Sequence, residues 1–135
     1  MSAERILVDT SAWVEYFRGG NKPLSILMEK WMDERSIYIP DVVLAELMQG
    51  ARTEAESETV EELRGSFEGL EPKPGTWIEA GKLSRSLRKM GKTIHLTDCF
   101  IAEVAFQHGC AVLTYDAHFV DIRRALDFQL IVLPK

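Results

Sequence analysis

The sequence predicts a three-layer α/β/α fold with a central, mainly parallel sheet of four to five strands. Strand and helix signals alternate along the whole chain, which is the pattern of βαβ units. Residues 6–8 and 111–114 are short apolar runs without alternation, typical of parallel strands buried on both faces. The 135 residues and the hydrophobic content of 46% suffice for one core, so we expect a single domain over residues 1–135.

Two helices are expected after the first strand. Residues 12–18 form the first, which ends at Gly19. The second has Asn21 as its amino-terminal cap and tolerates Pro23 in its first turn. Its apolar residues recur at the spacing of a buried stripe, which indicates packing rather than contact with a cofactor. These residues are Leu24, Leu27, Met28 and Trp31.

The middle of the chain combines a short strand with two unlike helices. Residues 37–40 are the strand, and residues 41–49 are a helix that ends at Gly50. Glu46 shares a face of this helix with apolar residues, where a lone acid is costly unless it meets a cation or a donor. Residues 53–67 are strongly acidic with a thin apolar stripe, which indicates a peripheral helix.

A basic helix follows an extended connection over residues 70–74. Residues 76–90 bury one side and carry cations on another, and such a stripe is a solvated face more often than a nucleic-acid site. The residues expected to be buried are Trp77, Ala80, Leu83, Leu87 and Met90. The cations are Lys82, Arg85, Arg88 and Lys89, with Lys92 nearby.

Residues 97–107 are apolar nearly all round, which predicts a central helix covered on both sides. Thr97 is the expected cap of this helix, and Asp98 lies in its first turn. A favourable interaction with the helix dipole would by itself account for an acid there, without a functional role. Residues 118–126 form a short amphipathic helix, and residues 128–133 form the last strand.

Composition limits the classes of function. A net charge of −5 gives no general attraction to nucleic acid, so a local patch would have to provide it. No apolar run approaches the roughly 20 residues of a membrane span, and no secretory signal opens the chain, so we expect a cytoplasmic protein. Cys99 and Cys110 lack the spacing of a zinc motif and are expected to be small core residues.

Four acids stand where an apolar segment meets a helix or a turn: Asp9, Glu46, Asp98 and Asp116. Asp9 and Asp116 follow the two buried strands, and the carboxyl ends of parallel strands lie at one edge of a sheet. Converging carboxylates repel one another unless some are protonated or a cation lies between them. If the four converge, the sequence therefore predicts bound Mg²⁺ or Mn²⁺.

Four motifs, in order along the chain, carry a resemblance to a known family: residues 8–13, 42–47, 96–102 and 113–119. They resemble the motifs of PIN-domain ribonucleases, and their spacing and the chain length are similar to those of the VapC toxins of type II toxin–antitoxin pairs. The resemblance covers essentially the whole chain. It implies a metal-dependent endoribonuclease that a small cognate antitoxin neutralises. One departure is His118, at a position where family members often carry a second acid, which puts a second metal ion in doubt.

The resemblance fits the chemistry that the acids suggest. Hydrolysis of a phosphodiester needs an activated water and neutralisation of charge on the phosphoryl oxygens, and carboxylate-held Mg²⁺ or Mn²⁺ supplies both. Asp9 and Asp98 are expected as the principal metal ligands, direct or through water. Asp116 would complete or support the site, and Glu46 would orient the attacking water or bind a second ion.

Two hydroxyls and two histidines flank the motifs. Ser11 and Thr114 are expected to fix carboxylates by hydrogen bonds, unless they are ordinary caps at strand ends. His95 and His118 could touch substrate phosphate, but loop histidines are more often solvated, so neither is assigned a catalytic role.

A protein partner is predicted from apolar residues that one small core is not expected to bury completely: Trp13, Tyr16, Phe17 and Leu63. They would line a groove for a partner's amphipathic helix, or else form a homodimer surface or plain core. Together with the resemblance, this predicts an RNA substrate, a VapB-like antitoxin, and a homodimer or larger toxin–antitoxin assembly.

Two alternatives belong to other classes of function. A phosphorylation-controlled receiver domain needs an acidic pair after the first strand and a lysine after the last, but Asp9 is followed by two hydroxyls and Lys135 ends the chain after Pro134. A catalytically inactive PIN-like binding module would keep the fold and bind no metal, although the presence of all four acids argues against it.

Overall fold

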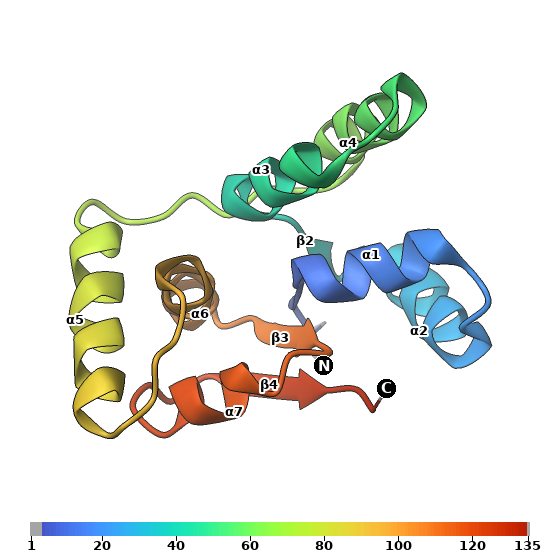
Figure 1. Cartoon of the computed structure of the whole chain (residues 1–135). Coiled ribbons are helices and arrows are strands. Elements are labelled where there is room, and N and C mark those ends of the chain that lie inside the picture. The colour runs from blue at the N-terminus through green and yellow to red at the C-terminus, as the bar shows by residue number, and fades with distance from the viewer. Residues whose placement is uncertain (1–3, 135) are drawn as a thin grey trace.

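The computed structural model describes residues 4–134, which form four strands and seven helices (Figure 1). The strands are β1 (Ile6–Val8), β2 (Ile37–Tyr38), β3 (Ala111–Thr114) and β4 (Gln129–Val132). The helices are α1 (Thr10–Arg18), α2 (Lys22–Asp33), α3 (Asp41–Gly50), α4 (Glu54–Ser66), α5 (Thr76–Lys89), α6 (Leu96–His108) and α7 (His118–Arg123). No helix within residues 4–134 has the length and apolarity to cross a membrane.

All four strands are parallel, in the order β2-β1-β3-β4. The strand β2 lies on one side of β1, and β3 and β4 lie on the other. The order in which strands are added therefore reverses between β1 and β3, which is the topological switch point of the sheet. In such sheets this position is where ligands bind, at the carboxyl ends of the strands. The predicted α/β fold with a parallel sheet is confirmed, with the lower of the expected strand numbers.

The two central strands form the middle of the core. Every residue of β1 and β3 is buried, which requires cover on both faces of the sheet. The helices α5, α6 and α7 pack against one another, and α1 and α2 lie at the opposite end of the view in Figure 1. This layering is what the unbroken apolar runs predicted.

The caps of two helices follow from their sequences. Asn21 Oδ1 accepts a hydrogen bond from the backbone N–H of Leu24 at 3.1 Å, as predicted for α2. The helix α6 itself was predicted, but its predicted cap at Thr97 was wrong, because the helix begins at Leu96 and His95 occupies the cap position without a side-chain hydrogen bond. The backbone carbonyl of His95 accepts from the N–H groups of Asp98 and Cys99, so Thr97 lies inside the first turn.

The predicted burial of α5 is wrong at two residues. Trp77 is 47% exposed and Met90 is 52% exposed. Thr76 takes the buried position in the first turn, where its Oγ1 donates to the carbonyl of Lys73 at 2.6 Å and accepts from Gln107 Nε2 at 2.8 Å. Trp77 is thereby turned to the side, and Met90 lies one residue beyond the end of the helix. Ala80, Leu83 and Leu87 are buried as predicted.

Two further predictions concern the periphery and the cysteines. Val60 and Leu63 are the buried residues of α4, which otherwise carries acids into solvent, as the sequence predicted. Cys99 and Cys110 are buried and free, as expected of small core residues. The helix α7 ends three residues earlier than predicted, at Arg123.

Candidate metal centre

Asp9 lies at the carboxyl end of β1 and is 4% exposed. Its backbone N–H donates to the carbonyl of Leu113 at 2.9 Å, which places it beside the end of β3. Burial raises the pKa of its carboxyl, and hydrogen bonds from Thr114, Ser11 and the local backbone oppose that rise. Burial of the Asp9 carboxylate therefore costs free energy, and the hydrogen bonds that it accepts offset part of this cost.

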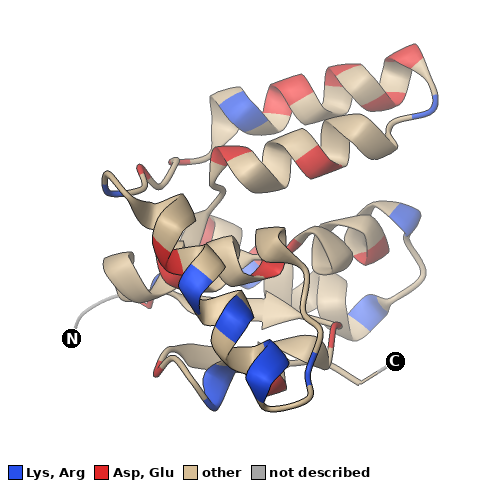
Figure 2. Cartoon of the chain, turned by 60° about the vertical axis from the view of Figure 1, so that its left-hand side comes forward, with Lys and Arg blue, Asp and Glu red and all other residues tan. Residues whose placement is uncertain are grey.

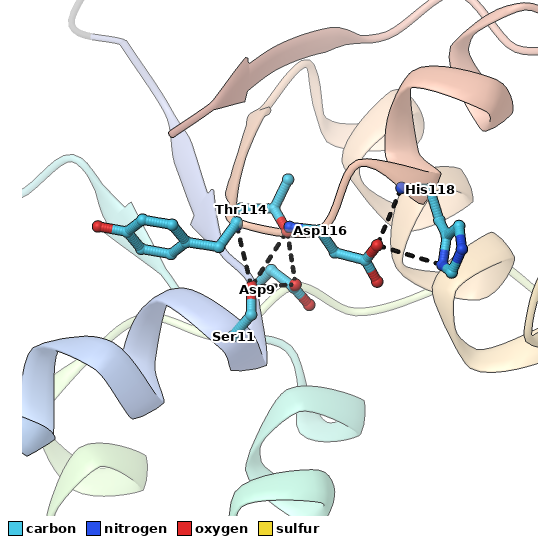
Figure 3. A network of polar contacts seen from close by, with 6 residues as sticks. Asp9, Ser11, Thr114, Asp116 and His118 are labelled. Atoms are coloured by element: carbon cyan, nitrogen blue, oxygen red, sulfur yellow. Dashed lines mark hydrogen bonds and ion pairs between the residues drawn. The ribbon is translucent and has the colours of Figure 1, made fainter. Parts of the chain in front are cut away.

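Two hydroxyls connect the backbone to this carboxylate (Figure 3). Thr114 Oγ1 donates to Asp9 Oδ2 at 2.8 Å and Ser11 Oγ donates to the same oxygen at 3.0 Å. Each hydroxyl in turn accepts a backbone N–H, that of Asp116 at 2.9 Å for Thr114 and that of Tyr115 at 3.1 Å for Ser11. The predicted role of both hydroxyls is confirmed. Both hydroxyls donate to Oδ2, so neither of them occupies Asp9 Oδ1.

Glu46 is brought to the site by α3. Thr10 Oγ1 donates to Glu46 Oε1 at 2.7 Å, across 36 positions of sequence. Thr10 is the first residue of α1, so this bond ties the start of α1 to α3. Sequence reasoning missed the pair, because Thr10 and Glu46 belong to different motifs and their distance depends on how the two helices pack.

Asp98 lies half-buried in the first turn of α6. Burial, followed by the negative charges of Asp9, Asp116 and Glu46, raises the pKa of Asp98 to about 7, while His95 lowers it. Coulombic effects of this kind require nearby charges. The ends of β1 and β3 and the helices α3 and α6 thus carry the four predicted acids, with Asp9 and Asp116 linked through Thr114 and the charges of Asp9, Asp116 and Glu46 acting on Asp98.

Asp116 lies after β3 and points toward His118 (Figure 3). Its Oδ1 accepts the backbone N–H of His118 at 2.9 Å and lies 3.2 Å from His118 Nδ1. Sequence reasoning left His118 without a role, but the structure gives it direct contact with one of the four acids. The only signal available was its position two residues after Asp116. His95 acts on the site through its charge, which lowers the pKa of Asp98.

Lysines and arginines of the described part of the chain do not neutralise the four acids. Within residues 4–134, no lysine or arginine forms an ion pair with any of them. No three acidic, histidine or cysteine side chains in that part of the chain are arranged to hold one metal ion together. Mg²⁺ is usually held by one or two carboxylates and keeps several waters. An ion of that kind would need only one or two of these carboxylates as direct ligands, with the other acids acting through water.

A groove of about 700 Å³ lies between α1, α3 and α4. Its apolar walls are formed by Val14, Phe17, Leu47 and Val60. Glu46 also lines the groove. Of the residues predicted to form a partner groove, only Phe17 lines it. Trp13 and Leu63 are buried in the core, where Trp13 stacks on Phe17 with 5.6 Å between ring centroids. Tyr16 packs against the core from outside the groove.

Comparison with known proteins gives consistent matches. The PIN domain family model matches residues 6–125. A VapC ribonuclease of Mycobacterium bovis and ribonuclease VapC11 of Mycobacterium tuberculosis are each 30% identical to this chain over 128 residues, covering 92% of it and 96% of the relative.

Solved structures share the fold at lower identity. VapBC2 from Rickettsia felis, bound to a DNA fragment from its promoter, has a TM-score of 0.75 at 18% identity and covers 95% of this chain and 98% of that one. DNA-bound VapBC from Salmonella typhimurium has a TM-score of 0.75 at 19% identity and covers 96% of this chain and 98% of that one.

Proposed function

Since this chain belongs to the PIN-domain family, we propose that it is a metal-dependent endoribonuclease and the toxin of a toxin–antitoxin pair. The proposal is supported by the negative charges of Asp9, Glu46 and Asp116, which act on the half-buried Asp98 while no lysine or arginine of residues 4–134 pairs with any of the four acids. The names of the 30% identical relatives, which are ribonucleases, support the same reaction. The chain would act in the cytoplasm, where its RNA substrate lies.

The acids have different tasks in this proposal. Bound Mg²⁺ or Mn²⁺ would activate a water and neutralise charge on the phosphoryl oxygens. Asp9 offers Oδ1 to the ion, because Ser11 and Thr114 hold its other oxygen. Asp98 is the second ligand, since a carboxyl whose pKa is raised by burial and by its acidic neighbours is stabilised in its charged form by a cation.

Glu46 and Asp116 support the reaction from either side. Thr10 holds Glu46 Oε1, which leaves Oε2 to accept a hydrogen bond from the attacking water and so orient it. Asp116 has Oδ1 directed at His118 and keeps Oδ2 for the ion or for a water in its shell. Because His118 adds no carboxylate, the acids of this chain favour one metal ion over two.

The experiment is RNA cleavage by the purified chain in Mg²⁺, with RNA ends identified by sequencing. We expect EDTA to abolish cleavage, and Asp98→Asn to reduce it by about 10² or more, because the charge is lost while volume is kept. Glu103→Gln is the matched control, an acid on the same helix away from the pocket, and should cleave as the wild type does. An Asp98→Asn protein with wild-type activity would show that Asp98 is not a ligand.

The proposed inhibitor is a VapB-like antitoxin whose amphipathic helix binds the groove between α1, α3 and α4. The groove has apolar walls and Glu46 among its lining residues, so a helix lying in it would extend a basic side chain toward that acid. An arginine there would compete with the metal for carboxylates. The resulting unit is a complex of toxin and antitoxin, with a toxin homodimer or a larger assembly as the expected form.

Co-expression tests this partner. The chain is produced with the product of the adjacent small open reading frame, the pair is purified, and RNA cleavage is measured. We expect a stable complex without activity, and Phe17→Glu in the groove to weaken it while the free chain still cleaves RNA. A complex as active as the free chain, or no complex, would remove the inhibitor from the proposal.

A further inference from the structure

Trp77 is the one tryptophan among residues 4–134 that reaches solvent, being 47% exposed while Trp13 is 0% and Trp31 is 6% exposed. Its ring stacks on that of Phe100, with 3.8 Å between centroids and 21° between planes. Phe100 is buried. The stack fixes the orientation of Trp77 and leaves part of the indole free, which is the arrangement of a platform for another ring.

The platform shares two helices with the candidate metal centre. Trp77 and Phe100 line a hollow of about 560 Å³, together with Val42 and Ala45 of α3. Ala45 precedes Glu46 in sequence, and Phe100 follows Asp98 by two residues on α6. Two of the elements that carry acids therefore also form walls of the hollow.

Charge decides which part of a nucleic acid the hollow would take. Asp41 and Glu71 also line it, and they would repel a phosphate. An uncharged base meets no such penalty and gains from stacking on Trp77.

The same helix carries cations. Arg85, Arg88 and Lys89 are exposed and form no ion pair with any acid in residues 4–134, whereas Lys82 pairs with Glu79 at 3.0 Å. Figure 2 shows blue bands along α5 toward its carboxyl end, in contrast with the red of α4. On a chain of net charge −5, this local surplus gives phosphate a site of attraction that the net charge does not provide.

One edge of α5 joins the platform to Arg88. Trp77, Gly81, Ser84 and Arg88 recur at i, i+4, i+7 and i+11, so they share one edge of the helix. This edge faces α6 and the segment before it, because Ser84 Oγ donates to the carbonyl of Ile94 at 3.2 Å and Trp77 stacks on Phe100. From Trp77 to Arg88 it extends about 16 Å, long enough for a short run of nucleotides.

We propose that this edge of α5 holds single-stranded RNA next to the metal centre, with one unpaired base stacked on Trp77 and phosphates held by Arg88 and its neighbouring cations. The inference rests on the proposed ribonuclease function and adds to it a positioning surface. A charged track combined with an aromatic platform is how proteins bind single strands without reading a fixed sequence. Trp77 and Arg88 are positioning residues, and the acids remain the catalytic ones.

The first test uses the fluorescence of Trp77. Since the other two tryptophans are buried, quenching of the exposed emission by a random-sequence pool of 12-nucleotide RNA in EDTA reports stacking without cleavage. We expect strong quenching by single strands. Duplex RNA of the same length should bind the cations but leave the emission nearly unchanged, because its bases are already stacked and paired.

The second test uses variants. Trp77→Ala should weaken binding of the single strands by about 5- to 100-fold, the range expected for one stacked base, and Trp77→Phe should restore most of it. Ile78→Ala, an exposed neighbour on the same helix, should bind as the wild type does. In cleavage assays Trp77→Ala should raise KM far more than it lowers kcat.

The salt dependence of binding tests the cations. Arg88→Ala should weaken binding and reduce the slope of log K against log salt by about 0.7 for each phosphate that the arginine neutralises. Arg64→Ala, an exposed arginine on α4, is the control and should change neither quantity.

The results separate this inference from the function on which it rests. If the wild type cleaves RNA but Trp77 is not quenched, or the Trp77 and Arg88 variants bind like the wild type, the surface on α5 is wrong and the ribonuclease proposal stands. If the chain neither cleaves nor binds RNA, both are overturned. Circular dichroism of Trp77→Phe confirms that the fold is kept in the variant that retains the ring.

Discussion

At the scale of single residues, the site depends on hydroxyls that orient its acids. Thr114 Oγ1 accepts from the backbone of Asp116 and donates to Asp9, so it connects two acids with one atom. Replacing it by valine keeps the shape but removes both bonds. The N–H of Asp116 would then lack its acceptor, and Asp9 would keep only Ser11 as a side-chain donor.

We expect Thr114→Val to lower metal affinity by about 10- to 100-fold, the usual effect of removing a group that orients a ligand. The free energy of unfolding should fall by about 1–3 kcal/mol, since a buried donor loses its partner. Mn²⁺ titration and thermal unfolding measure the two effects. Val132→Thr, an exposed exchange of similar size on β4, is the control. Unchanged Mn²⁺ affinity in Thr114→Val would mean that Asp9 needs no such support.

The sequence identified the acids because each interrupts an apolar segment, where an unpaired charge has a cost that only a cation or donors can offset. It also identified Ser11 and Thr114, because hydroxyls after a strand have the backbone within reach. It did not reveal Thr10 as the partner of Glu46 or His118 as the neighbour of Asp116. Those contacts depend on the packing of α1 on α3 and on the turn after β3.

At the scale of elements, α6 places Asp98, and its end is fixed by Gly109. This glycine has φ of 65° and ψ of 31°, the left-handed conformation of a helix cap, and nothing lies within 4 Å of where a Cβ would stand. Gly109→Ala should therefore lower the free energy of unfolding by about 1 kcal/mol through backbone conformation alone. Thermal or urea unfolding measures it.

Gly65 provides the matched comparison, because it lies within the helix α4. Nothing lies within 4 Å of where its Cβ would stand either. Gly65→Ala should raise the free energy of unfolding by up to about 1 kcal/mol. Equal effects of the two substitutions would contradict the assigned backbone conformations.

Elements were predictable where the pattern was local. The unbroken apolar runs of β1 and β3, the stripe of α2 and the cap at Asn21 each depend on residues close in sequence, and each was correctly predicted. The exposure of Trp77 was not predicted, because it depends on a contact between two helices. Thr76 takes the buried position and is hydrogen-bonded to Gln107 on α6. The exposed indole of Trp77 is the platform proposed for RNA, so the local pattern alone would not have revealed that surface.

At the scale of the whole molecule, the acidic pocket makes stability depend on pH and on metal. The pKa of Asp98 is raised from 3.8 to about 7, so between these values the folded state retains a proton that the unfolded state releases. The free energy of unfolding of the metal-free protein therefore receives a contribution that is present below about pH 4 and is lost as the pH rises to about 7.

Thermal unfolding in EDTA at about pH 5 and about pH 8, on either side of the raised pKa, tests this dependence. The wild type should lose more stability between the two pH values than Asp98→Asn, which carries no charge at that position. At the higher pH, Asp98→Asn should be the more stable of the two without metal, and millimolar Mg²⁺ should stabilise the wild type but not the variant. The same pH dependence in both proteins would place the titrating group elsewhere.

The central claim is that the four acids form a metal centre, and the most direct measurement is an anomalous difference map from a crystal of this protein soaked in Mn²⁺. We expect a peak in contact with Asp9 Oδ1 and Asp98, with Asp116 and Glu46 close enough to reach it directly or through water. Crystals of Asp9→Asn should lack the peak. The absence of a peak in the wild type, or a peak only outside the pocket of the four acids, would contradict the claim.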